Sequence, residues 1–188
     1  SDSDDLHKAV LVLGKDHRRG RAASGILHER WMKDPRMTEI LSFRPTPPAE
    51  WPIFEQPLAR ADEWMLALGV VRDGAGAVPR HFPVSQPELG LTGSRLLSQA
   101  GEIRASLYQA EILHKRYPRA LATSFLPDDI QRLEYPLAFA YILLREARTH
   151  EVSPHLLAGI LREESRFDPD AISAAAARGL AQFVLPTA

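Results

Sequence analysis

Glu164 is the residue in this chain best suited to acid chemistry. In the segment 153–165, apolar side chains at positions 156, 157, 160 and 161 recur at helical spacing, and Glu164 falls next on the same stripe. A carboxylate on the buried side of a helix is unfavourable unless it is paired or protonated. The apolar stripe and the negative end of the helix macrodipole both favour the protonated form. We therefore interpret Glu164 as a general acid; the alternative is a structural carboxylate paired with Arg145, Arg162 or Arg166.

A second carboxylate is the usual companion of an acid that cleaves glycosidic bonds. The local candidates are Asp168 and Asp170. Asp168 precedes Pro169, and Asp170 begins a loop, so both are expected to form turns. The residues alone thus predict an acid without an adjacent carboxylate partner.

Two sequence blocks surround this acid. They read Arg162-Glu-Glu-Ser-Arg-Phe-Asp-Pro169 and Ser173-Ala-Ala-Ala-Ala-Arg-Gly-Leu-Ala-Gln182. In this order and at this gap, they resemble the start of the catalytic domain of soluble lytic transglycosylases. These enzymes are relatives of goose-type lysozyme that cut bacterial peptidoglycan. The resemblance runs from about residue 135 to the end of the chain.

The resemblance implies a role for three residues. Glu164 would first protonate the bond between N-acetylmuramic acid and N-acetylglucosamine and then act as base, so that the muramyl 6-hydroxyl forms a 1,6-anhydro product. Ser173 would hydrogen-bond near this carboxyl or the substrate acetamido group, or it would be the N-cap of a following helix. Gln182 would line the sugar cleft, or it is a surface glutamine. No metal or organic cofactor is implied.

The chain also departs from the family pattern. Alanine occupies positions 174 and 176, where the family commonly has proline and glycine, and Ala181 stands in place of methionine. The family domain continues past the point that corresponds to Ala188. We therefore expect residues 134–188 to be the N-terminal portion of a transglycosylase domain, truncated in this chain.

The elements that must hold Glu164 are predicted to be helices. Apolar spacing favours an all-α fold, with helices over about residues 6–13, 20–31, 57–70, 87–99, 102–116, 135–150 and 153–165. Ser153 and Pro154 are a suitable N-cap and first residue for the last of these. The proline-rich segment 43–52 and the glycine-rich segment 72–78 are expected to be loops. Residues 1–133 are predicted to form helical hairpins of a superhelical, solenoid-like kind.

Composition limits the possible functions. The 188 residues are 45% hydrophobic, with 23 basic and 24 acidic side chains and no cysteine. The near-zero net charge and the lack of a long apolar run indicate no nucleic-acid partner and no membrane span. The basic segment 15–21 is expected to be a solvated loop, and His150 and His155 surface residues.

Three functions remain after this step. The first is a peptidoglycan lytic transglycosylase of the periplasm or cell envelope, without a leader in this chain. The second is a non-catalytic peptidoglycan-binding or scaffold protein whose helical region binds envelope proteins. The third is a muramidase of the same fold that uses water.

Overall fold

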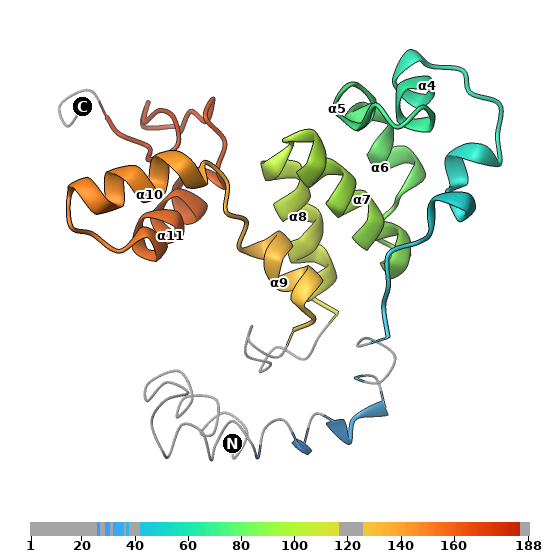
Figure 1. Ribbon diagram of the computed structural model, residues 1–188, viewed down its shortest axis with the longest axis horizontal. Helices are drawn as coiled ribbons and strands as arrows, with labels where there is room; N and C mark the ends of the chain where they lie inside the picture. Colours follow the sequence, from blue (N-terminus) through green and yellow to red (C-terminus); the bar gives the residue numbers. More distant parts are fainter. Residues whose placement is uncertain are drawn as a thin grey trace.

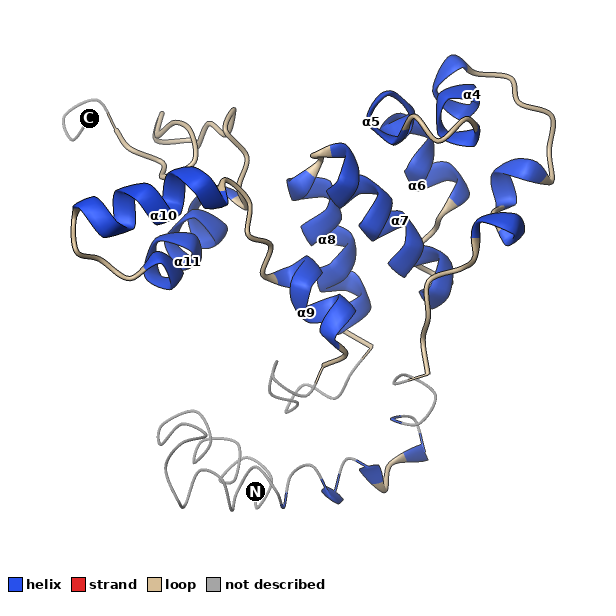
Figure 2. Cartoon of the chain, in the orientation of Figure 1, coloured by secondary structure: helices blue, strands red, loops and turns tan. Residues whose placement is uncertain are grey.

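The computed structural model describes residues 42–116 and 126–184, together with positions 26, 29, 30, 32–35 and 37. Regular structure in these residues is helical (Figure 2), and the only β pairing among them is two isolated bridges within residues 172–183. The predicted all-α class is confirmed. The predicted helix 6–13, most of the predicted helix 20–31 and the basic segment 15–21 lie outside the described residues. The elements are η1 (Pro48–Glu50), η2 (Pro52–Phe54), α4 (Ala61–Ala67), α5 (Val71–Gly74), η3 (Ala75–Ala77), α6 (Val78–His81), α7 (Pro87–Ala100), α8 (Ile103–His114), α9 (Asp128–Glu134), α10 (Ala140–Thr149) and α11 (Pro154–Ser165).

The helices form a row of three groups (Figure 1). The short helices α4–α6 lie at one side, α10 and α11 lie at the other, and α7–α9 stand between them. Among the described residues, no helix is long and apolar enough to cross a membrane.

Helices α7 and α8 form the predicted hairpin, within a residue or two of the expected bounds. Gly101 ends α7 in the left-handed region, with φ 87°, a conformation that glycine adopts without steric cost. Where the helices cross, the buried hydroxyls of Ser94 and Ser106 each donate a hydrogen bond to the other residue's backbone carbonyl oxygen, and both distances are 2.8 Å. These reciprocal bonds satisfy both buried hydroxyls, so the two helix backbones can approach closely.

The segment 72–78 is not the loop that its glycines predicted. It forms α5, η3 and the start of α6, and these turns pack against α4. A side-chain carbon at Gly74 would lie 2.5 Å from the backbone nitrogen of Leu66. The glycine is therefore needed for close helix packing rather than for chain flexibility. The core beneath includes Ile53, Leu66, Ala77, Val78 and Phe82, all fully buried.

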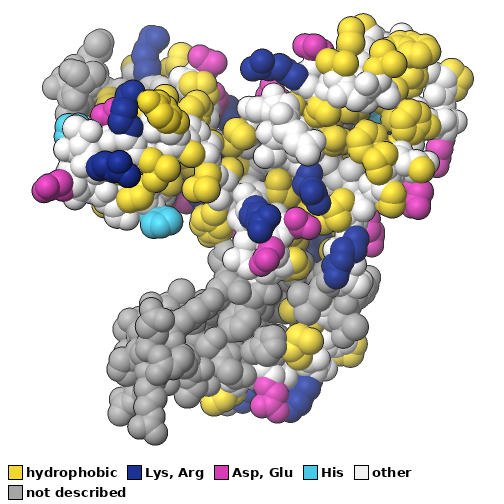
Figure 3. Space-filling model, in the orientation of Figure 1, with side chains coloured by type: hydrophobic (Ala, Val, Ile, Leu, Met, Phe, Trp, Pro, Cys, Tyr) yellow, Lys and Arg dark blue, Asp and Glu magenta, His cyan; other side chains and the backbone are white. Residues whose placement is uncertain are grey.

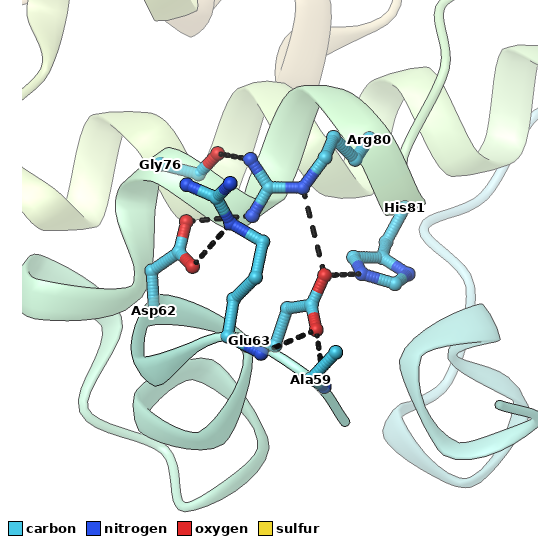
Figure 4. A network of polar contacts seen from close by, with 7 residues as sticks. Ala59, Asp62, Glu63, Gly76, Arg80 and His81 are labelled. Atoms are coloured by element: carbon cyan, nitrogen blue, oxygen red, sulfur yellow. Dashed lines mark hydrogen bonds and ion pairs between the residues drawn. The ribbon is translucent and has the colours of Figure 1, made fainter. Parts of the chain in front are cut away.

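A polar network joins α4 to α6 (Figure 4). The Glu63 carboxylate accepts hydrogen bonds from the backbone N–H of Ala59 at 2.9 Å and of Arg60 at 3.1 Å, which caps the start of α4. Its other oxygen lies 3.4 Å from His81 Nε2. The neighbouring Asp62 pairs with Arg80 at 2.6 Å. These bonds use backbone donors and α6 side chains, which makes the cluster a structural cap.

The region between the hairpin and the last helices differs from its prediction in two places. Residues 128–134 form α9, which is not among the predicted helices. Helix α10 begins at Ala140 instead of about 135, because Phe139 takes a left-handed conformation with φ 56° that interrupts a helix. Helix α11 begins and ends as predicted, within one residue.

Candidate active site

Helix α11 ends in a sharp turn directly after the candidate acid. Pro154 occupies its first position and Ser153 precedes it, although the Ser153 hydroxyl makes no capping bond. At the other end, Arg166 and Phe167 both take left-handed conformations, with φ 53° and 61°. Phe167 is buried, at 3% exposure, and so anchors the turn. Glu164 therefore lies in the last turn of a helix with a well-defined end.

The part of the stripe that carries Glu164 faces solvent in this structure. Leu156 is 59% exposed, Ile160 is 43% exposed, and Glu164 is exposed as well, whereas Leu157 and Leu161 are partly buried. The helical spacing was predicted correctly, but the expectation that Glu164 lies on a buried side of α11 was wrong. Figure 3 shows hydrophobic side chains at the surface over α10 and α11. The exposed large hydrophobic residues between positions 135 and 183 include Tyr135, Leu137, Tyr141, Ile142, Leu144 and Phe183.

The three arginines that offered a structural role for Glu164 have other partners. Arg145 pairs with Glu146 at 2.7 Å, and Arg166 lies 3.5 Å from Glu111. Arg162 binds Glu111 at 3.2 Å and Glu163 at 2.6 Å. Within the described part of the chain, the Glu164 carboxylate forms no hydrogen bond or ion pair. A structural ion pair is therefore not what this carboxylate does here.

Arg162 also ties α11 to the end of α9. Its Nε donates to the backbone carbonyl of Glu134 at 2.9 Å, and its guanidinium lies over the Tyr135 ring, 5.0 Å from the ring centre. The Glu134 side chain is almost completely buried and meets His114 Nδ1 at 2.7 Å. Helices α8, α9 and α11 thus meet at one polar joint.

Asp168 forms the turn that was predicted for it. One of its carboxylate oxygens accepts the backbone N–H of Asp170 at 2.9 Å, and the other binds Arg104 of α8 at 2.6 Å. With both oxygens engaged, Asp168 is an anchor of the turn and not a free second carboxylate.

Ser173 closes a loop rather than a helix. Its hydroxyl oxygen accepts the backbone N–H groups of Ala175 at 3.2 Å and Ala177 at 3.1 Å. The prediction of a following helix was wrong, because residues 173–184 are turns and isolated bridges. Ala176 adopts φ 61°, a conformation that favours glycine. The loop therefore keeps a glycine-type backbone although alanine occupies the position.

Gln182 lies at the other end of this loop. Its side-chain Nε2 donates to the carbonyl oxygens of Gly179 at 2.8 Å and Ala171 at 3.0 Å. Gly179, with φ 72°, donates its own N–H to the same Ala171 carbonyl at 2.9 Å. The structure thus brings Ser173 and Gln182 into one loop, but neither is hydrogen-bonded to Glu164. In the part of the chain that the structure describes, no cluster of three or more acidic or histidine side chains could hold a metal ion.

Comparison with known proteins bears on this same segment. Residues 142–188 match the family model of the Transglycosylase SLT domain. The match covers the last quarter of the chain and includes Glu164, Ser173 and Gln182. The resemblance seen in the two sequence blocks is confirmed, and an SLT domain implies peptidoglycan as the substrate. The match begins within α10, so the division of the chain at residue 134 stays a prediction. No curated protein and no solved structure matches the chain.

Helix α8 contributes to this site through two residues that the sequence alone did not indicate. Arg104 binds Asp168, 64 positions later in the sequence. Glu111 binds Arg162, 51 positions later, and Arg166. Exposed charges on a helix are common, and nothing in their spacing distinguished these two from solvated residues. Only the structure reveals their partners.

Proposed function

We propose that this chain is part of a peptidoglycan lytic transglycosylase that acts in the cell envelope, with Glu164 as its acid and base. The observation that carries the proposal is the SLT match, which spans both sequence blocks. The geometry adds support, because Glu164 is exposed and unpaired while its charged neighbours Arg162, Glu163 and Arg166 are all engaged. A carboxyl group in this position is free to meet a substrate.

The proposed reaction proceeds in two proton transfers. Glu164 donates its proton to the glycosidic oxygen, and the bond from the muramyl anomeric carbon to that oxygen breaks. The resulting carboxylate then takes the proton of the muramyl 6-hydroxyl, whose oxygen bonds to the anomeric carbon. The products are a free 4-hydroxyl on the leaving sugar and a 1,6-anhydro ring. No water is consumed, and Glu164 ends in its starting protonation state.

The proposed places of Ser173 and Gln182 follow from their shared loop. The Ser173 hydroxyl accepts two backbone bonds, so its own proton remains as a donor toward substrate. The Gln182 Nε2 is used within the loop, which leaves its carbonyl oxygen as an acceptor. We propose that these groups meet the polar substituents of the sugar beside the bond that is cut.

Digestion of purified sacculi tests this proposal. We expect the wild-type protein to release muropeptides that are one water lighter than hydrolysis products, as judged by mass spectrometry. Glu164→Gln should lower the rate by about a hundredfold to ten-thousandfold, the usual contribution of a positioned acid. Glu163→Gln is the matched control and should retain activity. Products with a reducing muramic acid would instead indicate a muramidase, and unchanged activity in Glu164→Gln would contradict the role of this residue.

One observation favours a second candidate, glycan binding without cleavage. Tyr141 is 77% exposed and directly precedes the matched segment, and Phe183 is 59% exposed and lies within it. Aromatic side chains offer a flat apolar face together with, in tyrosine, a polar edge. This combination suits sugar rings. Sedimentation with sacculi, without release of any soluble product, would support this candidate over the enzyme.

A further inference from the structure

The link between α8 and α11 is built from charged side chains rather than from close helix packing. Helix α11 packs against α10, whereas its contact with the hairpin runs through Arg162 and Arg166, which both reach Glu111. A second bridge, from Arg104 to Asp168, lies beyond the end of α11 at 2.6 Å. The hairpin therefore holds the last turn of α11 through a few specific bonds.

Glu111 is the centre of this link. It binds the two arginines that stand two positions before and two positions after Glu164. Its side chain is 22% exposed, and that of Arg162 is 18% exposed, so the pair is shielded in part from water. Charge-assisted bonds in such a setting are stronger than exposed ion pairs.

Helix geometry explains how the contacts of Glu111 with the two arginines affect Glu164. Residues two positions apart lie about 200° apart around a helix, so Arg162 and Glu164 point to opposite sides of α11. When Arg162 is fixed against the hairpin, Glu164 is turned away from it. The C-terminal residue of the turn, Arg166, is held by the same carboxylate, so the helix end cannot rotate without breaking both contacts.

We propose that Glu111 is a positioning residue for the candidate acid, and that the hairpin α7–α8 is thereby a working part of the catalytic unit. This inference rests on the proposed function of Glu164. Glu111 contacts Arg162 and Arg166 and acts on Glu164 through them.

The test compares Glu111→Gln with Glu163→Gln. Each substitution removes one of the two carboxylates that pair with Arg162, but Glu163 is 76% exposed and belongs to α11 itself. Of the two, only Glu111→Gln removes a charge that the hairpin contributes to its link with α11; the bridge from Arg104 to Asp168 stays in place. Hydrogen exchange is measured at the backbone amides of Arg166, Phe167 and Asp168, which bond within the last turn. Circular dichroism confirms that each variant is folded, and Arg104→Gln, which removes only the second bridge, serves if Glu111→Gln fails to fold.

We expect exchange at these three amides to rise by roughly tenfold in Glu111→Gln, because the charge-assisted bonds that hold the turn are lost. We expect Glu163→Gln to match the wild type. In the sacculus assay, Glu111→Gln should lower kcat by about tenfold and leave KM within about twofold, because a displaced acid weakens chemistry more than binding.

Several results would overturn the inference. Equal exchange in Glu111→Gln and wild type would show that Glu111 does not hold the turn. Equal increases in the two variants would show that only local charge matters. Raised exchange with an unchanged kcat would remove its role in positioning the acid. If the wild-type chain forms no anhydro product, the proposed function fails on its own, while the exchange comparison still decides whether Glu111 holds the helix.

Discussion

Substitution of Gly74 by alanine should test how closely α4 and α5 pack. The added carbon would lie 2.5 Å from the Leu66 backbone nitrogen and 2.7 Å from both its Cα and Cβ. Gly74 has φ −87°, which alanine adopts freely, so the cost is steric alone. Because a backbone cannot rotate away as a side chain can, α5 must shift. Overpacking of this kind destabilises by about 1–3 kcal/mol, and we expect the upper half of that range.

Gly159→Ala is the matched control within the same protein. Gly159 lies in the interior of α11, and nothing lies within 4 Å of the carbon that would be added. Alanine is the better helix former, so this substitution should stabilise by about 0.5–1 kcal/mol if α11 unfolds with the rest of the chain. The same chemical change thus has opposite expected signs at the two positions.

Urea unfolding followed by far-UV circular dichroism measures both effects. We expect a lower midpoint for Gly74→Ala and a slightly higher midpoint for Gly159→Ala, with the slope of the transition unchanged. In thermal unfolding, a chain of this length shifts by about 2–4 °C per kcal/mol. A Gly74→Ala protein that unfolds at the wild-type urea concentration would refute the close approach of α5 to Leu66, and with it the structural explanation of this glycine.

Two further predictions concern polar side chains of α4 and α7. The backbone N–H groups of Ala59 and Arg60 and the His81 side chain hold the pKa of the Glu63 carboxyl below its ordinary value. The contribution of ionised Glu63 to the free energy of unfolding is therefore fully present above the pKa that Glu63 has in the unfolded chain. It is lost as the pH falls through the lower pKa of Glu63 in the folded protein. Melting temperature should fall more steeply with acid in wild type than in Glu63→Gln; parallel curves would contradict this. Thr92→Val removes the acceptor of the Thr46 backbone N–H, a contact of 2.6 Å, and should destabilise by about 1–3 kcal/mol, whereas a variant as stable as wild type in urea would show that water replaces it.

The parts of the fold that were predicted correctly carry their signals within a few residues. Helix α7 begins with Pro87 and ends before Gly101, and α11 begins with Pro154. Each signal acts through the local backbone, so it holds in any tertiary setting. Gly74 is the opposite case. The glycine-rich segment predicts a loop, but glycine is required at position 74 by the nearby backbone of Leu66, which no local pattern reveals.

In the candidate site, too, some residues could be predicted from local sequence and others could not. Glu164, Ser173 and Gln182 could be named from two short blocks, since these residues lie close together in sequence. The bonds within the Ser173–Gln182 loop required the structure, because they depend on left-handed residues such as Ala176 that sequence patterns do not predict. The role of Glu111 could not be predicted for a further reason, because its partner Arg162 is 51 positions away in the sequence.

The exposed stripe of α11 shows what helical periodicity does and does not predict. Leu156, Ile160 and Glu164 do share one face, as their spacing requires. Helical spacing does not show whether other residues cover this face. In this structure Leu156 is 59% exposed and Ile160 is 43% exposed. Glu164 is therefore a candidate acid because its carboxylate is left unpaired while Glu111 and Glu163 engage the nearby arginines, and not because it is buried among apolar side chains. A bound glycan strand or another protein segment on this face would supply the apolar surroundings that favour a protonated acid only while it is in place.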